Sequence, residues 1–173
     1  FVPKHLGGLE ASPLVSAKIF ERLAQGNAAC GWVAFIAATS GSTLGNIPQD
    51  TARTIFSHPN TMVAGVFAPS GKATVKAGEV TVEGRWQWGS GTQNADWILG
   101  GCLVDVAADK PSQHMILMPA EQVEFLDTWH VSGLQGTGST DYEVKNLTLP
   151  DSHIVGYDGN RPPRSSLYQF PQF

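Results

Sequence analysis

The hydrophobic positions of the first sixty residues recur with a helical period. Ser12 followed by Pro13 is a typical helix start, because a hydroxyl can cap the first turn and proline suits the first helical position. The apolar residues that follow return every three or four positions, at Leu14, Ala17, Phe20, Leu23 and Ala24. This pattern predicts a helix with one buried face that ends near Gly26.

A second helix is predicted from Ala28 to about Ser40, with Asn27 as its cap. This segment is apolar almost all round, so we expect it to be buried on several sides. A third, shorter helix is predicted to begin at Ile47-Pro48 and to end before His58-Pro59, because a residue that precedes proline disfavours helical geometry.

From Thr61 onward, the period changes to the alternation that is typical of strands. The turn at Ala68-Pro69-Ser70-Gly71 is expected to end the first strand, and alternation places Val80 and Val82 on one face, joined by Trp86 and Trp88 if it continues. Short strands with Gly and Pro turns predict an antiparallel β-barrel, closed or nearly so, in an α+β fold. The predicted strands are 61–67, 74–76, 80–88, 97–106, 113–118, 123–126 and 142–149, with a glycine-rich loop at 129–140.

This change of period divides the chain into parts. We expect a partial N-terminal helical domain in residues 1–60, a middle barrel domain in 61–156, and a polar, Pro-rich linker in 157–173. The chain starts at Phe1 and stops at Phe173, so we expect it to be an internal portion of a longer protein and to be inactive alone.

The composition excludes several classes of function. The net charge is -4 and no basic run occurs, which argues against a nucleic-acid partner. No apolar stretch was expected to span a bilayer, so the predicted location is cytoplasmic. Cys30 and Cys102 lie in apolar contexts that favour buried, reduced thiols, although a disulfide stays open. No CxxC or HxxxH motif occurs, so no metal site is predicted.

One stretch, Gly84 to Gly91, combines aromatic rings with a turn. Three tryptophans, at 86, 88 and 97, surround the single hydroxyl of Ser90. An indole could lie against a flat ring while Ser90 bonds to the edge of that ring, and Gly89 and Gly91 would let the ring approach the backbone. The ordinary alternative is a β-hairpin with core aromatics.

Trp88, Ser90, Gly91 and Trp97 resemble the flavin-contacting turn of the acyl-CoA dehydrogenase superfamily. The resemblance implies N-terminal helices, a middle β-barrel and a C-terminal helical bundle, of which this chain lacks the bundle. It also implies that Trp88 is the wall for the flavin ring and that Ser90 lies near flavin N5. The strand from Met62 to Pro69 would line the pyrimidine side of the ring with backbone groups of Ala64, Gly65, Val66 and Phe67.

Three further motifs are similar to the reduced-flavin monooxygenases of this superfamily, which include the oxygenase components of two-component 4-hydroxyphenylacetate and steroid-phenol hydroxylases. The motifs are Ala68-Pro69-Ser70-Gly71, Gly84-Arg85-Trp86-Gln87-Trp88-Gly89-Ser90-Gly91, and Asp127-Thr128-Trp129 with Gly133-Leu134-Gln135-Gly136-Thr137-Gly138-Ser139. The Thr-Glu-Pro and Ser-Asp pattern of the dehydrogenases is missing after Phe67, which argues against a coenzyme A thioester as substrate.

The same branch implies roles for two helical residues. Trp32 would lie near flavin and substrate, although a buried helical face explains it equally well. Ser40 stands where the branch usually carries a histidine, and a serine cannot act as a base near neutral pH. The resemblance places the general base in the bundle that this chain lacks.

The sequence therefore predicts a flavin-dependent oxidoreductase. Reduced FAD or FMN, supplied by a flavin reductase, would form a C4a-(hydro)peroxide that hydroxylates a small, aromatic substrate, in a homo-oligomer that is a dimer or a tetramer. The first alternative is an acyl-CoA dehydrogenase that uses FAD, and the second is a non-catalytic barrel that binds a partner.

Overall fold

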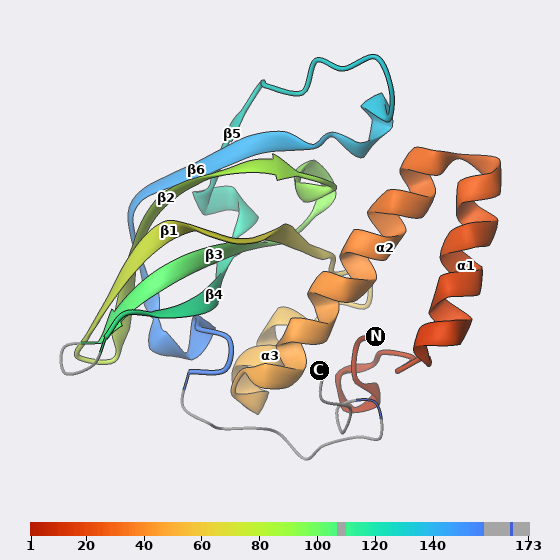
Figure 1. The fold of residues 1–173 in the computed structure, drawn as a ribbon. Helices are drawn as coiled ribbons and strands as arrows, with labels where there is room; N and C mark the ends of the chain where they lie inside the picture. The colour runs from red at the N-terminus through yellow and green to blue at the C-terminus, as the bar shows by residue number, and fades with distance from the viewer. Residues whose placement is uncertain (107–109, 158–166, 168–173) are drawn as a thin grey trace.

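The computed structural model describes residues 1–106, 110–157 and 167. The α-helices come first along the chain and lie beside the single sheet that the strands form (Figure 1). The helices are α1 (Pro13–Gly26), α2 (Ala28–Ser42) and α3 (Gln49–Ile55). Both predicted caps are confirmed, because the Ser12 hydroxyl accepts the Val15 N–H at 3.4 Å and the Asn27 side chain accepts the Cys30 N–H at 3.1 Å. Apart from residues 157 and 167, the predicted linker lies outside the described residues.

The helices bury less of their apolar surface than the sequence predicted. Leu14 and Leu23 of α1 are exposed, and α2 buries only Gly31, Ser40 and Gly41. The prediction that α2 is buried on several sides is therefore wrong for the described chain. The reason is that α2 packs on α1, on β1 and on residues Gln135–Thr137 and leaves part of its apolar surface uncovered, so that Trp32 and Phe35 stay partly exposed.

Six strands form one sheet in the order β4-β3-β1-β2-β6-β5. Four neighbouring pairs are antiparallel, but β1 and β3 run parallel, because β2 returns on one side of β1 and the chain then crosses to the other side. The predicted order of helices and then strands is confirmed, whereas no ladder joins the edge strands β4 and β5 within the described ranges. The strands are β1 (Val63–Lys76), β2 (Glu79–Gly89), β3 (Trp97–Val106), β4 (Ser112–Pro119), β5 (Glu124–Leu126) and β6 (Thr140–Pro150).

The predicted turn at residues 68–71 is a bulge inside the single long strand β1. The pairing of β1 with β3 shifts between Val66 and Gly71, and residues 67–70 are exposed. Gly101 of β3 makes room for the bulge, because a Cβ atom there would lie 2.2 Å from the Phe67 carbonyl oxygen. Backbone pairing on both sides of the bulge keeps the strand continuous, which turn-forming residue types alone do not reveal.

β1 and β2 separate at the middle of the sheet. Their pairing ends at Gly71 and Gly84, after which β2 pairs with β6 alone. The buried indole of Trp86 fills the point of separation, where Cβ atoms at Gly71, Gly84 and Gly100 would each lie within about 3 Å of it. Trp86 also stacks on Tyr142 with ring centroids 5.2 Å apart, so these two rings join the halves of the sheet.

The cysteines and the apolar helix differ in part from expectation. Both thiols are free, but Cys30 is exposed, whereas burial raises the pKa of Cys102 to about 12. In the described part of the chain, Ala28–Asn46 has a mean hydropathy of 1.2 and could cross a membrane by length and composition, contrary to the prediction of no such stretch. The core helices of many proteins meet the same criterion.

Candidate functional site

The predicted flavin turn lies at the end of β2 and carries an exposed tryptophan in a strained conformation. Val80, Val82 and Trp86 are buried on one face, as alternation predicts, but Trp88 is 71% exposed. The backbone of Trp88 is left-handed, with a φ of 62°, and the pairing of β2 with β6 shifts between Trp86 and Gly89. A left-handed residue with a side chain costs roughly 1–2 kcal/mol, so other contacts must hold Trp88 in place.

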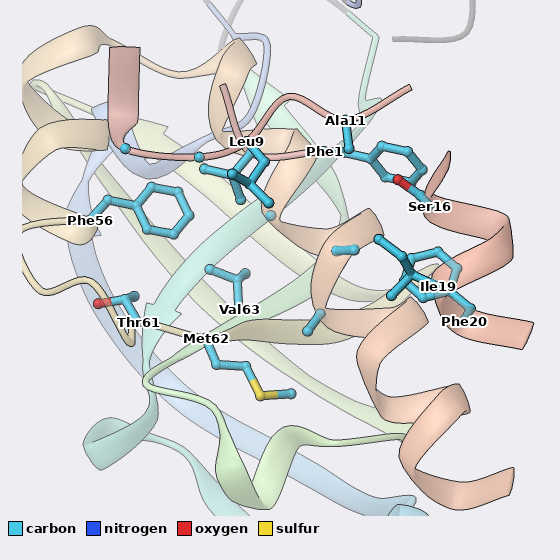
Figure 2. Close-up of a pocket in the computed structure, with 16 residues that line it drawn as sticks. Phe1, Leu9, Ala11, Ser16, Ile19, Phe20, Phe56, Thr61, Met62 and Val63 are labelled. Atoms are coloured by element: carbon cyan, nitrogen blue, oxygen red, sulfur yellow. The ribbon is translucent and has the colours of Figure 1, made fainter. Parts of the chain in front are cut away.

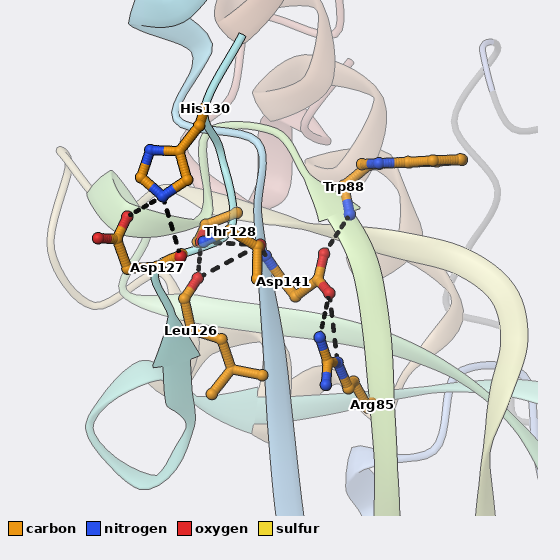
Figure 3. A network of polar contacts seen from close by, with 8 residues as sticks. Arg85, Trp88, Leu126, Asp127, Thr128, His130 and Asp141 are labelled. Carbon is orange, nitrogen blue, oxygen red and sulfur yellow. Dashed lines mark hydrogen bonds and ion pairs between the residues drawn. The ribbon is translucent and has the colours of Figure 1, made fainter.

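Asp141 of β6 supplies these contacts (Figure 3). Its side chain, 6% exposed, accepts the Trp88 N–H at 3.4 Å and two N–H groups of Arg85 at 2.8 and 3.2 Å. Burial by itself would raise the pKa of Asp141, but the hydrogen bonds from Arg85, Trp88 and Thr128 outweigh it and lower the pKa overall. The carboxylate thus stays ionised and ties Arg85 to the strained turn.

Ser90 lies at the centre of a second set of contacts. The Trp32 indole N–H donates to the Ser90 hydroxyl at 2.9 Å, although the two residues are 58 positions apart. The Ser90 hydroxyl also contacts the Ser139 hydroxyl at 2.7 Å, and Ser139 contacts Thr137 at 2.6 Å. The structure therefore brings together Trp32 and Ser90, two of the residues that the resemblance placed at one site.

The two glycines of the turn serve internal packing. A Cβ atom at Gly89 would lie 2.8 Å from the Tyr142 ring, and one at Gly91 would lie 3.1 Å from Met62. Gly91 also has a φ of 74°, and its N–H donates to the Thr137 carbonyl at 2.9 Å. The expectation that these glycines open space for a ligand is wrong at the Cβ positions, because protein atoms already fill that space.

The predicted flavin-lining strand has mixed exposure. Ala64 is fully buried in the core, and the Val66 N–H donates to the Tyr142 hydroxyl at 3.0 Å, so neither is free for a ligand. Gly65 packs against β3, where a Cβ atom would lie 2.0 Å from the Leu99 carbonyl oxygen. Phe67, at the start of the bulge, is exposed. Of this strand, the exposed bulge offers the most accessible backbone.

Ser40 lies apart from the turn. It is eight residues beyond Trp32 on α2, about 12 Å along the helix axis. Its side chain is 1% exposed, and its hydroxyl has no hydrogen-bond partner in the described structure. Nothing in its surroundings would let this hydroxyl act as a base.

An apolar cavity of about 480 Å³ lies between the N-terminal loop, α1, α2 and the start of β1 (Figure 2). Ile19 and Phe20 of α1 line it, as do Phe56 and Val63. Met62 lines it as well and would contact a side chain at Gly91, so the cavity ends beside the turn. None of the described lining residues has a charged side chain.

Sequence reasoning missed four residues of the site: Arg85, Thr137, Ser139 and Asp141. All but Asp141 stand in motifs that were recognised, but no role was assigned to them, and the segment from 133 to 139 was interpreted as a glycine-rich connection. Only Asp141 lies in β6, whereas Thr137 ends a 3-10 turn and Ser139 precedes the strand, so no regular spacing in the sequence predicted that these side chains meet.

These features fit a bound flat aromatic group with a hydrogen-bond donor at its edge. Trp88 offers an exposed indole face, and the Ser90 hydroxyl has one lone pair left after accepting from Trp32 and donating onward. Within the described ranges, no cluster of three metal-ligating side chains occurs.

Comparison with known proteins shows which proteins this chain is related to. The chain is 33% identical over 172 residues to "Indole-3-acetate monooxygenase" of Pseudomonas putida, covering 98% of this chain and 44% of that protein. It is 30% identical over 156 residues to "Flavin-dependent monooxygenase, oxygenase subunit HsaA" of Mycobacterium tuberculosis, covering 90% of this chain and 40% of that protein. The chain is a homologue of flavin-dependent monooxygenase oxygenase components. It spans less than half the length of these oxygenase components.

Solved structures of other proteins have the same fold. The crystal structure of the HsaA monooxygenase from M. tuberculosis superposes with a TM-score of 0.87 at 27% identity, covering 98% of this chain and 47% of that chain. XiaF from Streptomyces sp., in complex with FADH2 and glycerol, superposes with a TM-score of 0.82 at 25% identity, covering 90% and 40%. No family model matches the sequence. The expected acyl-CoA dehydrogenase-like fold and its monooxygenase branch are confirmed.

Proposed function

We propose that the protein that contains this chain is a flavin-dependent monooxygenase that hydroxylates a small aromatic substrate with molecular oxygen. The observation that carries this proposal is the turn itself, where an exposed indole in a strained conformation stands beside a buried hydroxyl with one free acceptor position. Strain of this kind persists only where other contacts enforce it, and such positions cluster at functional sites.

In this proposal, each residue of the turn has its own task. Trp88 covers one face of the flavin ring, and Ser90 accepts a hydrogen bond from the ring edge near N5. Gly65 and Phe67 border the pyrimidine side, where the exposed bulge after Val66 supplies backbone groups, while Ala64 and Gly91 shape the site through packing. Bound reduced flavin supplies the electrons that activate oxygen. Trp32 fixes Ser90 and excludes water from its hydroxyl.

Further features of the whole protein follow from the relatives. One relative is named an oxygenase subunit, which supports a separate flavin reductase as partner, and XiaF is described with FADH2, which supports FAD as cofactor; FMN stays the alternative. We also propose the division into parts at 1–60, 61–156 and 157–173, a homo-oligomer and a cytoplasmic location. Neither Ser40 nor any described residue of the turn supplies a base, so a base from the rest of the protein is part of this proposal.

Anaerobic titration of the complete protein tests the function. Reduced FMN and reduced FAD should bind, and oxygen with a phenolic substrate should then give hydroxylated product. Trp88→Ala should weaken binding of reduced flavin about tenfold, because about 1.4 kcal/mol of ring contact is lost. Trp88→Phe should retain most of the affinity, and Leu103→Ala, which removes an exposed apolar side chain on β3, should leave it unchanged. Flavin reduction by an acyl-CoA without a reductase would instead support a dehydrogenase.

A further inference from the structure

Four side chains form one continuous line of hydrogen bonds from α2 to the loop before β6. The Trp32 indole contacts Ser90 at 2.9 Å, Ser90 contacts Ser139 at 2.7 Å, and Ser139 contacts Thr137 at 2.6 Å. The line ends where the Thr137 hydroxyl donates to the Leu134 carbonyl at 2.9 Å. Ser90, Thr137 and Ser139 are all buried, so water does not compete for these contacts.

Only one arrangement of protons satisfies every contact. A carbonyl cannot donate, so the single proton of Thr137 points to Leu134. The proton of Ser139 must then point to Thr137, and the proton of Ser90 must point to Ser139. The Trp32 indole is a donor only, so it donates to Ser90. Ser90 is left with no proton to give to a ligand and with one lone pair that can accept.

The backbone keeps this line in place. The Gly91 N–H donates to the Thr137 carbonyl at 2.9 Å, which ties the turn to the loop. The Thr137 N–H donates to the same Leu134 carbonyl as its hydroxyl does, at 3.0 Å. The loop also packs on α2, so the donor, the turn and the end of the line belong to three contacting segments (Figure 1). Rotation of the Ser90 hydroxyl would break a hydrogen bond without a substitute.

We propose that Ser139 and Thr137 are positioning residues that hold Ser90 as a hydrogen-bond acceptor and so select reduced over oxidised flavin. This inference rests on the proposed function, because it takes Ser90 to lie at the N5 edge. N5 of reduced flavin carries a hydrogen and can donate to Ser90. N5 of oxidised flavin has only a lone pair, which needs a donor, and two acceptors facing each other repel. Ser139 and Thr137 therefore set the redox preference of the site without touching the ring.

The test compares affinities for the two redox states in the complete protein. Oxidised and reduced FMN, and the same two states of FAD, are titrated anaerobically, and the ratio of oxidised to reduced dissociation constants is measured. Ser139→Ala frees the Ser90 proton, so oxidised flavin should bind more tightly and the ratio should fall about three- to tenfold. Thr137→Val should lower the ratio in the same direction, because Ser139 can then donate to Ser90.

Two control variants leave the line of hydrogen bonds intact. Thr137→Ser retains the hydroxyl and should keep the wild-type ratio. Thr92→Val removes another buried hydroxyl of the same turn, one that donates to the Gly89 carbonyl at 2.7 Å outside the line, and should also keep the ratio even if both affinities change. An unchanged ratio in Ser139→Ala and in Thr137→Val overturns the positioning role and leaves the flavin site standing. A wild-type protein that binds neither redox state overturns both proposals.

Discussion

At the turn, Trp88 has a left-handed backbone conformation that is unfavourable for a residue with a side chain. Trp88 is left-handed because Asp141 accepts its N–H, and Asp141 stays ionised because Arg85 lies beside it. The strain at Trp88 is thus offset by a charge-assisted contact on the neighbouring strand. A substitution at Asp141 should therefore affect stability and the turn together.

Asp141→Asn should destabilise the protein by about 1–3 kcal/mol at pH 7, because Arg85 loses its charged partner at a buried carboxylate. The lowered pKa of Asp141 means that its contribution is present above the unfolded-state pKa of about 3.9 and is lost as pH falls through the folded-state value. The gap between wild type and variant in urea unfolding should therefore shrink below about pH 4. Asp127→Asn, at an exposed carboxylate, is the matched control; an equal loss there would contradict the argument.

Ser90→Ala is the second test at this scale. The fold should persist, and flavin affinity should fall by about 0.5–1.5 kcal/mol for one lost hydrogen bond. A larger effect is expected on coupling, with faster release of hydrogen peroxide and less hydroxylated product per reduced flavin consumed. Stopped-flow mixing of the reduced, flavin-loaded protein with oxygen measures both. Traces identical to wild type would remove Ser90 from the site.

At the scale of strands, one buried side chain joins several strands of the sheet. The Tyr142 hydroxyl of β6 accepts the Val66 N–H of β1 and donates to the Leu99 carbonyl of β3, so one side chain joins three strands across the separation in the sheet. Burial raises the pKa of Tyr142, which keeps the hydroxyl protonated and able to donate.

Tyr142→Phe should cost about 2–4 kcal/mol in the free energy of unfolding, since the buried Leu99 carbonyl and the part-buried Val66 N–H lose their partner while the stack on Trp86 remains. Chemical denaturation measures this loss. Thr148→Val, on β6 like Tyr142, removes an exposed hydroxyl contact with Thr81 of β2 and should change stability by less than about 0.5 kcal/mol. A Tyr142→Phe variant as stable as wild type would show that water or another group satisfies Val66 and Leu99.

The sequence predicted helices and strands well where local patterns determine them. The caps at Ser12 and Asn27 and the strand from Trp97 follow from residue type and period. The β1 bulge did not, because it depends on a glycine of another strand, at position 101. The Trp88 turn was recognised by resemblance, whereas the partners of Ser90 lie about 50 residues away and only folding brings them together.

The whole chain leaves its candidate site open. Trp88, on β2, and Trp32 and Phe35, on α2, are all substantially exposed. Exposed rings of this size are typical of surfaces that contact something else. The relatives are more than twice as long as this chain, and we propose that further protein covers these rings in the complete protein.

Residues 1–173 alone should therefore bind reduced flavin at least tenfold more weakly than the complete protein. A ring held only by Trp88 and Ser90 keeps one face in water, and each 100 Å² of apolar surface left unburied forfeits about 2.5 kcal/mol. Anaerobic fluorescence titration of both proteins measures the difference, and circular dichroism of the shorter one checks that the sheet persists. Micromolar or tighter binding by residues 1–173 would mean that the turn, the bulge and α2 form a complete flavin site without other contacts.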